Sequence, residues 1–369
     1  MKSLSRPLEI GIVVHGPAPV YSKEAKNIID LLSSIGNVSA VAGGTMCRTA
    51  IIDEGLRDVI DISSCDPPSI ALLSFRDADA LVVINHGKTL ESGINFGEIV
   101  AGRVNNVKSI IHAERIFEAD GTVIIWGNDE DDRIASEVAS VIAGHFKSRI
   151  RQIKPKYVPA VEIEGFNYRK ISGVLPGEPL FVGGTFVGTV VGREVRIKAK
   201  RGLICGIEGV KIKDSGLAKI GPVDLDNVMI KSGWLRDDIT FPRIMTVKEG
   251  PGKAVMIDHT AFLSMDTVKP DTVCAITVGD DTTEVACDIL ARLGIRAIGI
   301  TDGDKDSILK DTVVPKGSVI IRVSGITDDE AGVDAYSCVA GNNDTFEGFS
   351  QKVISFLEGR KISYTITRY

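Results

Sequence analysis

The chain has 369 residues, of which 44% are hydrophobic and 25% charged, and it carries a formal net charge of −6. This apolar content supports packed cores and excludes disordered, collagen-like and coiled-coil classes. The acidic balance argues against a protein built around nucleic-acid phosphates, so we do not expect a nucleic-acid partner. At about 100–200 residues per domain, the length predicts two or three domains.

Three features of the sequence predict the cellular compartment of the protein. No apolar stretch approaches the ~18–20 residues that cross a bilayer. The first apolar run, Ile10–Val14, is too short for a secretory signal. The six cysteines are scattered and form no C-x-x-C pair, whereas disulfide frameworks are typical of short secreted chains. We therefore expect a soluble, cytoplasmic protein with no membrane partner, and the sequence carries no signal for its oligomeric state.

Residues 1–150 alternate strand-like and helix-like patterns. The predicted strands are Ile10–Val14, Val38–Ala42, Ala80–Ile84, Ser109–His112 and Thr122–Trp126. Helical spacing predicts one helix that starts at the N-cap residue Ser22 and stops at Gly36, and another from about Asp132 to Phe146. Strands that are apolar throughout and lie between helices are typical of a mostly parallel sheet covered on both faces.

The pattern changes in the middle of the chain. Lys, Arg and Pro crowd Arg149–Pro155, which predicts a linker. Over residues 156–241, short alternating runs broken by glycines predict strands with one buried face, and no long helical pattern occurs. We expect a small, mostly antiparallel β domain here.

An α/β pattern returns over residues 254–369. The predicted strands are Thr272–Val278, Arg296–Ile300 and Ser318–Val323, and the predicted helices are Thr282–Leu293 and Thr345–Leu357. The fold class is therefore α/β, with two mostly parallel α/β domains, 1–150 and 254–369, flanking the β domain 156–241.

An acidic cluster follows each of the three strands predicted in the last segment. The clusters are Asp280-Asp281 with Glu284, Asp302-Gly303-Asp304, and Asp328-Asp329-Glu330. If the strands are parallel, all three clusters leave the carboxyl edge of one sheet, where open α/β sheets bind ligands. Converging carboxylates repel one another unless a cation lies between them, and Mg²⁺ prefers oxygen ligands together with phosphate. We therefore predict Mg²⁺ as a cofactor, held by Asp280, Asp281, Glu284, Asp302 and Asp304.

Other interpretations of these clusters remain open. Asp281 and Glu284 have the spacing of a capping box, and Asp302-Gly303-Asp304 is also typical of a turn. A Toprim domain holds Mg²⁺ with a Glu after its first strand and an Asp-x-Asp after a later one, which is similar in outline. Glu284 departs from that pattern because it lies inside a predicted helix rather than at the strand end.

A second set of candidate residues follows the strands of the first segment. Gly-rich turns at helix starts offer backbone N–H groups that favour anions. The predicted anion-binding residues are His15, Gly16, Gly43, Gly44, Thr45, His86, Gly87, Lys88 and Thr89. The alternative is that these are three ordinary strand-to-helix connections.

Six stretches of the sequence together resemble a known family. They are Ile12-Val-Val-His-Gly-Pro, the run from Ala42-Gly-Gly-Thr to Glu54-Gly-Leu, Ile207-Glu-Gly-Val-Lys-Ile-Lys with Gly216-Leu, and Gly279-Asp-Asp-Thr-Thr-Glu with Gly299-Ile-Thr-Asp-Gly-Asp. The resemblance is to the archaeal family called domain of unknown function 2117, and it covers nearly the whole chain. It implies an archaeal cytoplasmic protein and transfers no catalytic residue.

Three functions follow from the residues. The first is binding of a phosphorylated small molecule or nucleotide with Mg²⁺ at the C-terminal acidic edge. The second is a non-catalytic interaction or regulatory module, in which the acidic residues only cap helices. The third is a Toprim-like nucleotidyl transferase or nuclease, against which the acidic pI counts. The sequence does not decide whether the protein is an enzyme.

Overall fold

The computed structural model of the protein describes residues 6–64, 66–104, 109–127, 132–156, 160–234, 242–258, 265–303 and 313–369. The strands of these residues form four sheets, which makes this a mixed α/β protein. The chain divides into two compact units. The first unit comprises Met1–Glu178, Gly188–Lys213 and Gly221–Val228, and the second comprises Pro179–Val187, Asp214–Ile220 and Met229–Tyr369. The three-domain boundaries stay a prediction.

The N-terminal sheet has six strands in the order β2-β1-β3-β4-β5-β6. The strands are β1 (Leu8–His15), β2 (Gly36–Gly43), β3 (Ala80–Asn85), β4 (Ile110–Glu114), β5 (Thr122–Trp126) and β6 (Arg149–Ile153). The helices are α1 (Ala18–Tyr21), α2 (Glu24–Ser33), α3 (Thr45–Asp53), α4 (Pro68–Leu73), α5 (Leu90–Arg103) and α6 (Arg133–Phe146). The first four strands are parallel, while β5 is antiparallel to β4 and parallel to β6.

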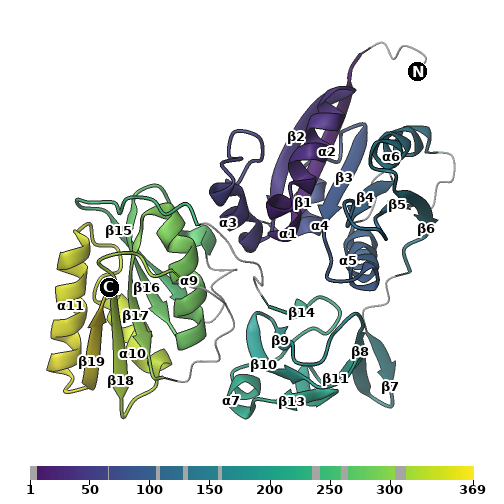
Figure 1. Ribbon diagram of the computed structural model, residues 1–369. Coiled ribbons are helices and arrows are strands. Elements are labelled where there is room, and N and C mark those ends of the chain that lie inside the picture. The colour runs from purple at the N-terminus through teal and green to yellow at the C-terminus, as the bar shows by residue number, and fades with distance from the viewer. Residues whose placement is uncertain are drawn as a thin grey trace. The chain divides into compact units, whose positions relative to one another are not determined.

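Helices cover both faces of this sheet, as the apolar strands predict (Figure 1). Alternate residues of β1 point to opposite faces, so that Ile12 packs with helices α1, α2, α3 and α6 while Val13 packs with α4 and α5. Because β1, β3 and β4 are parallel, His15, Asn85 and Glu114 end their strands at the same carboxyl edge.

Local predictions in this segment needed two corrections. Helix α2 begins at Glu24 after Lys23, which is left-handed (φ 69°), so Ser22 does not cap it, and Gly36 opens β2. The predicted linker at Arg149–Pro155 is wrong because Arg149–Ile153 is the sixth strand of the sheet. Most of its side chains are exposed at the sheet edge, so the strand lacks the apolar pattern that would have identified it.

Two four-stranded sheets lie in the middle of the chain. Their orders are β12-β11-β8-β7 and β13-β10-β9-β14. The elements are β7 (Val161–Ile163), β8 (Phe166–Ile171), β9 (Pro179–Val182), β10 (Thr185–Val190), β11 (Val195–Lys200), β12 (Leu203–Glu208), β13 (Val210–Ile212), α7 (Asp214–Ala218) and β14 (Ile230–Ser232). Strands β7, β8, β11 and β12 pair antiparallel with their neighbours, as do β10 with β13 and β9 with β14, which confirms the predicted β-rich character.

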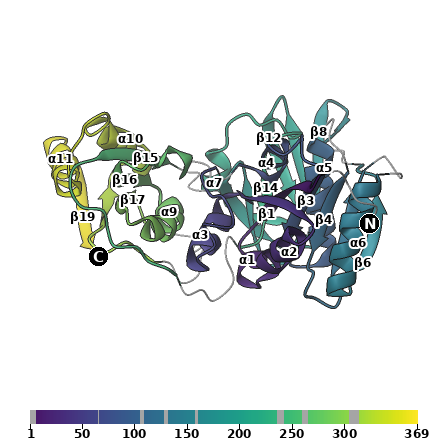
Figure 2. The same ribbon diagram turned by 90° about the horizontal axis from the view of Figure 1, so that it is seen from above.

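The C-terminal sheet has five strands in the order β15-β16-β17-β18-β19. The elements are β15 (Lys253–Asp258), the 3₁₀ turn η1 (Met265–Thr267), β16 (Thr272–Val278), α9 (Asp280–Leu293), β17 (Arg296–Thr301), β18 (Val319–Ser324), α10 (Asp328–Ser337), α11 (Phe346–Gly359) and β19 (Ser363–Arg368). The first four strands are parallel and β19 is antiparallel to β18. Helix α9 covers one face, and α10 and α11 cover the other (Figures 1 and 2).

No helix in the described ranges combines the length and the apolar character that a bilayer-spanning segment needs.

Candidate functional site

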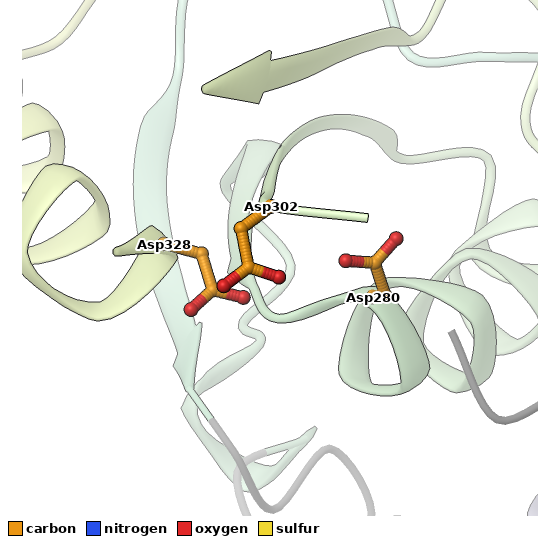
Figure 3. A group of neighbouring side chains, drawn as sticks. All are labelled: Asp280, Asp302 and Asp328. Carbon is orange, nitrogen blue, oxygen red and sulfur yellow. The ribbon is translucent and has the colours of Figure 1, made fainter. Parts of the chain in front are cut away.

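The C-terminal sheet brings three carboxylates together at its carboxyl edge. Asp280 opens α9 directly after β16, Asp302 follows β17, and Asp328 opens α10 after β18. One oxygen from each side chain lies within 4.8 Å of those from the other two. Figure 3 shows the three side chains pointing into a common space. Because the strands are adjacent and parallel, the fold itself produces this convergence.

Local backbone geometry holds these side chains in place. Gly279 precedes α9 with φ 99°, a left-handed conformation that glycine adopts without strain. The backbone N–H of Gly303, which has φ 95°, donates a hydrogen bond to Asp280 Oδ2 at 2.8 Å. Thr327 caps α10 by accepting a hydrogen bond from the backbone N–H of Glu330. Asp280 and Asp328 each occupy the first turn of a helix, where the helix dipole favours an ionised carboxylate.

A cation and a groove adjoin the carboxylates. Arg322 Nε donates to the backbone carbonyl of Asp302 at 3.3 Å. A Cβ atom on residue 303 would lie 2.1 Å from Arg322 Nη2, so only glycine lets the guanidinium pack this closely. Asp302, Gly303, Arg322, Ser324, Gly325 and Thr365 line a groove of about 630 Å³. A positive group therefore lies beside a cluster of negative ones.

Only some of the predicted metal ligands lie in the group of converging carboxylates. Asp280 and Asp302 belong to the carboxylate group, whereas Asp281 and Glu284 do not, and Asp304 lies outside the described residues. The capping-box interpretation is wrong because Gly279 is the N-cap and Asp281 already lies inside the helix. The predicted ligands omitted Asp328. The sequence feature that could have identified Asp328 is the third acidic cluster, which follows the third strand at the same edge.

The N-terminal sheet has a polar network at its own carboxyl edge. Glu114 is fully buried. It accepts hydrogen bonds from Gly87 N at 2.6 Å, from Asn85 Nδ2 at 2.6 Å and from His112 Nε2 at 3.0 Å. Trp126 Nε1 donates to His112 Nδ1 at 3.3 Å. Three N–H donors satisfy this carboxylate without any ligand.

The network also fixes the orientation of His15. Since Asn85 Nδ2 donates to Glu114, the Asn85 Oδ1 atom faces His15 Nδ1 at 2.7 Å, and Nδ1 must carry the proton. The lone pair of the neutral ring is then on Nε2. The ring also stacks on Phe96, with 4.1 Å between centroids.

Other predicted anion-binding residues have internal partners. His86 Nδ1 contacts Glu24 Oε2 at 2.9 Å, and this hydrogen bond raises the pKa of His86 although partial burial opposes it. Lys88 pairs with Glu178 at 2.5 Å, and Thr89 caps α5.

The glycine turns after β1 and β2 differ from the turn after β3. Gly16 and Gly44 have positive φ angles and open space where a Cβ would lie. Gly43 ends β2, and Thr45 opens α3. Anion binding at these glycines stays a prediction.

Comparison with known proteins identifies the chain's relatives. Residues 12–342 match the family described as "Uncharacterized protein conserved in archaea (DUF2117)". The chain belongs to this archaeal family. It is 41% identical over 326 residues to "Uncharacterized protein MJ0065" of Methanocaldococcus jannaschii, an alignment that covers 88% of this chain and 90% of the relative. No solved structure matches the chain. The resemblance read from the sequence motifs is thereby confirmed.

Proposed function

We propose that this archaeal protein binds a phosphorylated small molecule, such as a nucleotide, together with Mg²⁺ at the carboxyl edge of its C-terminal sheet. Asp280, Asp302 and Asp328 would hold the cation directly or through water, and Arg322 would contact the phosphate. We assign binding to this edge and no reaction.

The observation that supports a metal site is the convergence of the three carboxylates. Oxygens within 4.8 Å of one another, from segments that follow three different strands, repel when ionised. A divalent cation relieves this repulsion, and oxygen ligands match the preference of Mg²⁺. Mg²⁺ keeps several waters and is commonly shared between one or two carboxylates and a phosphate.

The observation that favours a phosphate is Arg322 beside Asp302. A guanidinium binds phosphate through two parallel hydrogen bonds. The adjoining groove of about 630 Å³ is within the range of small-molecule sites. Ser324 and Thr365 add hydroxyl groups to its wall. A metal on the carboxylates and a guanidinium at the same edge would together neutralise a phosphate.

Isothermal titration calorimetry with Mg²⁺ tests the metal. We expect binding to the wild type, a loss of about tenfold or more in affinity for Asp302→Asn and Asp328→Asn, and wild-type affinity for the control Asp281→Asn. Titration with pyrophosphate in saturating Mg²⁺ tests Arg322, where Arg322→Gln should weaken pyrophosphate and leave Mg²⁺ unchanged. Equal Mg²⁺ binding by wild type and Asp302→Asn would contradict the proposal.

The same variants distinguish the metal-site proposal from the alternative of a non-catalytic interaction module. That alternative requires that Asp302→Asn leave function intact. The Toprim-like alternative has less support, because Asp280 and not Glu284 lies with Asp302. Metal-dependent nicking or primer synthesis by the purified protein would restore it.

A further inference from the structure

One face of the sheet β12-β11-β8-β7 gathers basic and aromatic side chains. On β11, Val195, Ile197 and Ala199 are buried, and the alternate residues Arg196, Lys198 and Lys200 point to the opposite face. On β8, Phe166 and Tyr168 share that face, since Lys198 pairs with Tyr168 across the two strands. The alternation thus separates an apolar core face from a cationic, aromatic outer face.

The two lysines rest on the aromatic rings. Lys198 Nζ lies 3.9 Å from the centroid of Phe166 and 5.6 Å from that of Tyr168. Lys200 Nζ lies 4.7 Å from the Phe166 centroid. Among the described residues, no carboxylate forms an ion pair with Lys198 or Lys200. By contrast, Lys170 and Arg196, farther along the same face, have Glu194 as a partner.

Exposed aliphatic residues border the rings. Val161 and Ile163 pair with Tyr168 and Phe166 across β7 and β8 and are 51% and 54% exposed, and Leu203 beside Lys200 is 55% exposed. The partner must therefore offer flat apolar surfaces to rings and aliphatic groups, and negative charge to the ammonium groups.

We propose that this face binds single-stranded nucleic acid. Bases stack on Phe166 and Tyr168, and the displaced ammonium groups of Lys198 and Lys200 move onto phosphates. Cations on alternate residues of one strand recur about every 7 Å, which is comparable with the phosphate repeat of an extended single strand. The chain's net charge of −6 describes the molecule as a whole, whereas an open sheet face with aromatic rings and two lysines without acidic partners has the opposite local charge.

Fluorescence anisotropy with labelled oligo(U) and oligo(dT) of about 12 nucleotides tests the proposal. We expect both to bind the wild-type chain at low salt, with little competition from a duplex. Phe166→Ala should weaken binding about tenfold, and Phe166→Trp should retain it because the ring is kept. Lys198→Ala/Lys200→Ala should reduce the slope of log affinity against log salt by about 0.7 for each lysine.

The matched control is Lys26→Ala/Arg76→Ala, which removes the same charge from another surface of the same unit and should bind like the wild type. Circular dichroism confirms that each variant folds. Absence of binding, or equal binding by Phe166→Ala and Phe166→Trp, overturns the proposal. So does a wild-type dimer, detected by light scattering, that Phe166→Ala converts to monomer, since the face would then be covered by a second copy of the chain.

Discussion

The carboxyl edges of the two largely parallel sheets carry acidic side chains in opposite settings. At the N-terminal edge, Glu114 is buried and accepts hydrogen bonds from three N–H groups of the protein. At the C-terminal edge, oxygens of Asp280, Asp302 and Asp328 lie within 4.8 Å of one another, and Asp280 also accepts a hydrogen bond from the backbone N–H of Gly303. Strand topology brings polar groups to both edges. The hydrogen-bond donors near each carboxylate decide whether the protein itself satisfies that carboxylate. An edge whose carboxylate is already satisfied is structural, and an edge where carboxylates converge favours a cation.

Removing Glu114 should have the largest effect on stability. Glu114→Ala leaves the Asn85, Gly87 and His112 donors without an acceptor in a buried position, which we expect to cost about 3–5 kcal/mol in the free energy of unfolding. Chemical denaturation measures the loss. The control Glu162→Ala, at an exposed position of β7, should change stability by less than about 0.5 kcal/mol. A loss below about 1 kcal/mol at Glu114 would show that the network is not structural.

A pair of glycine substitutions sharpens the same comparison. A Cβ at Gly93 in α5 would lie 2.1 Å from Glu114 Cδ, whereas a Cβ at Gly144 in α6 would meet nothing within 4 Å. Gly93→Ala should therefore destabilise the protein by about 2 kcal/mol or more, because the close contact forces the core to shift. Gly144→Ala should stabilise it by about 0.5 kcal/mol, since alanine is the better helix former. Thermal unfolding of both variants checks the difference in sign, and a gain in stability at Gly93 would contradict the packing.

Removing one acidic group at the C-terminal edge should have the opposite sign to Glu114→Ala. Without divalent cations, Asp302→Asn relieves repulsion and should raise stability by about 0.5–1 kcal/mol. The neighbouring control Asp281→Asn removes a favourable charge from the first turn of α9 and should lower stability by about 0.3–1 kcal/mol. Denaturation in chelator provides the measurement. A clear loss of stability in Asp302→Asn would mean that protein donors already satisfy that carboxylate.

The smallest expected effect concerns His86 and pH. Its hydrogen bond to Glu24 raises the pKa of His86 above 6.5 in the folded protein. A raised pKa stabilises the folded state fully below pH 6.5, and this contribution is lost as the pH rises through the folded pKa. Glu24→Gln should lower the pKa of His86, and it should reduce stability more at pH 6 than at pH 8. Nuclear magnetic resonance titration of His86 follows the shift, and an unchanged pKa would exclude Glu24 as its cause.

The sequence predicted the features that depend on regular apolar patterns. Thr122–Trp126 and Thr272–Val278 are strands with the predicted bounds, because continuous apolar runs identify strands that are buried on both faces. Helix α5 was missed because Gly93 and Gly97 resemble helix breakers. In the structure, those glycines give room to Glu114 and to the side chains of His112 and Trp126.

The sequence predicted where the candidate site lies but not which carboxylates form it. Three acidic clusters at one edge follow from parallel strands, so the edge itself was foreseeable. Which carboxylates meet depends on where each helix starts. Gly279 begins α9 early enough to place Asp280 at the edge and Glu284 in a buried turn, and Thr327 places Asp328 at the start of α10. Spacing along the chain does not contain that information.

The most direct test of the C-terminal metal site is anomalous X-ray scattering from crystals of the protein soaked in Mn²⁺, a stand-in for Mg²⁺ with similar oxygen ligands. We expect an anomalous peak between Asp280, Asp302 and Asp328, within coordination distance of at least two of the three carboxylates, and no peak beside Glu114. A map with no peak among the three aspartates, or with a peak beside Glu114 instead, would contradict the contrast between the two edges.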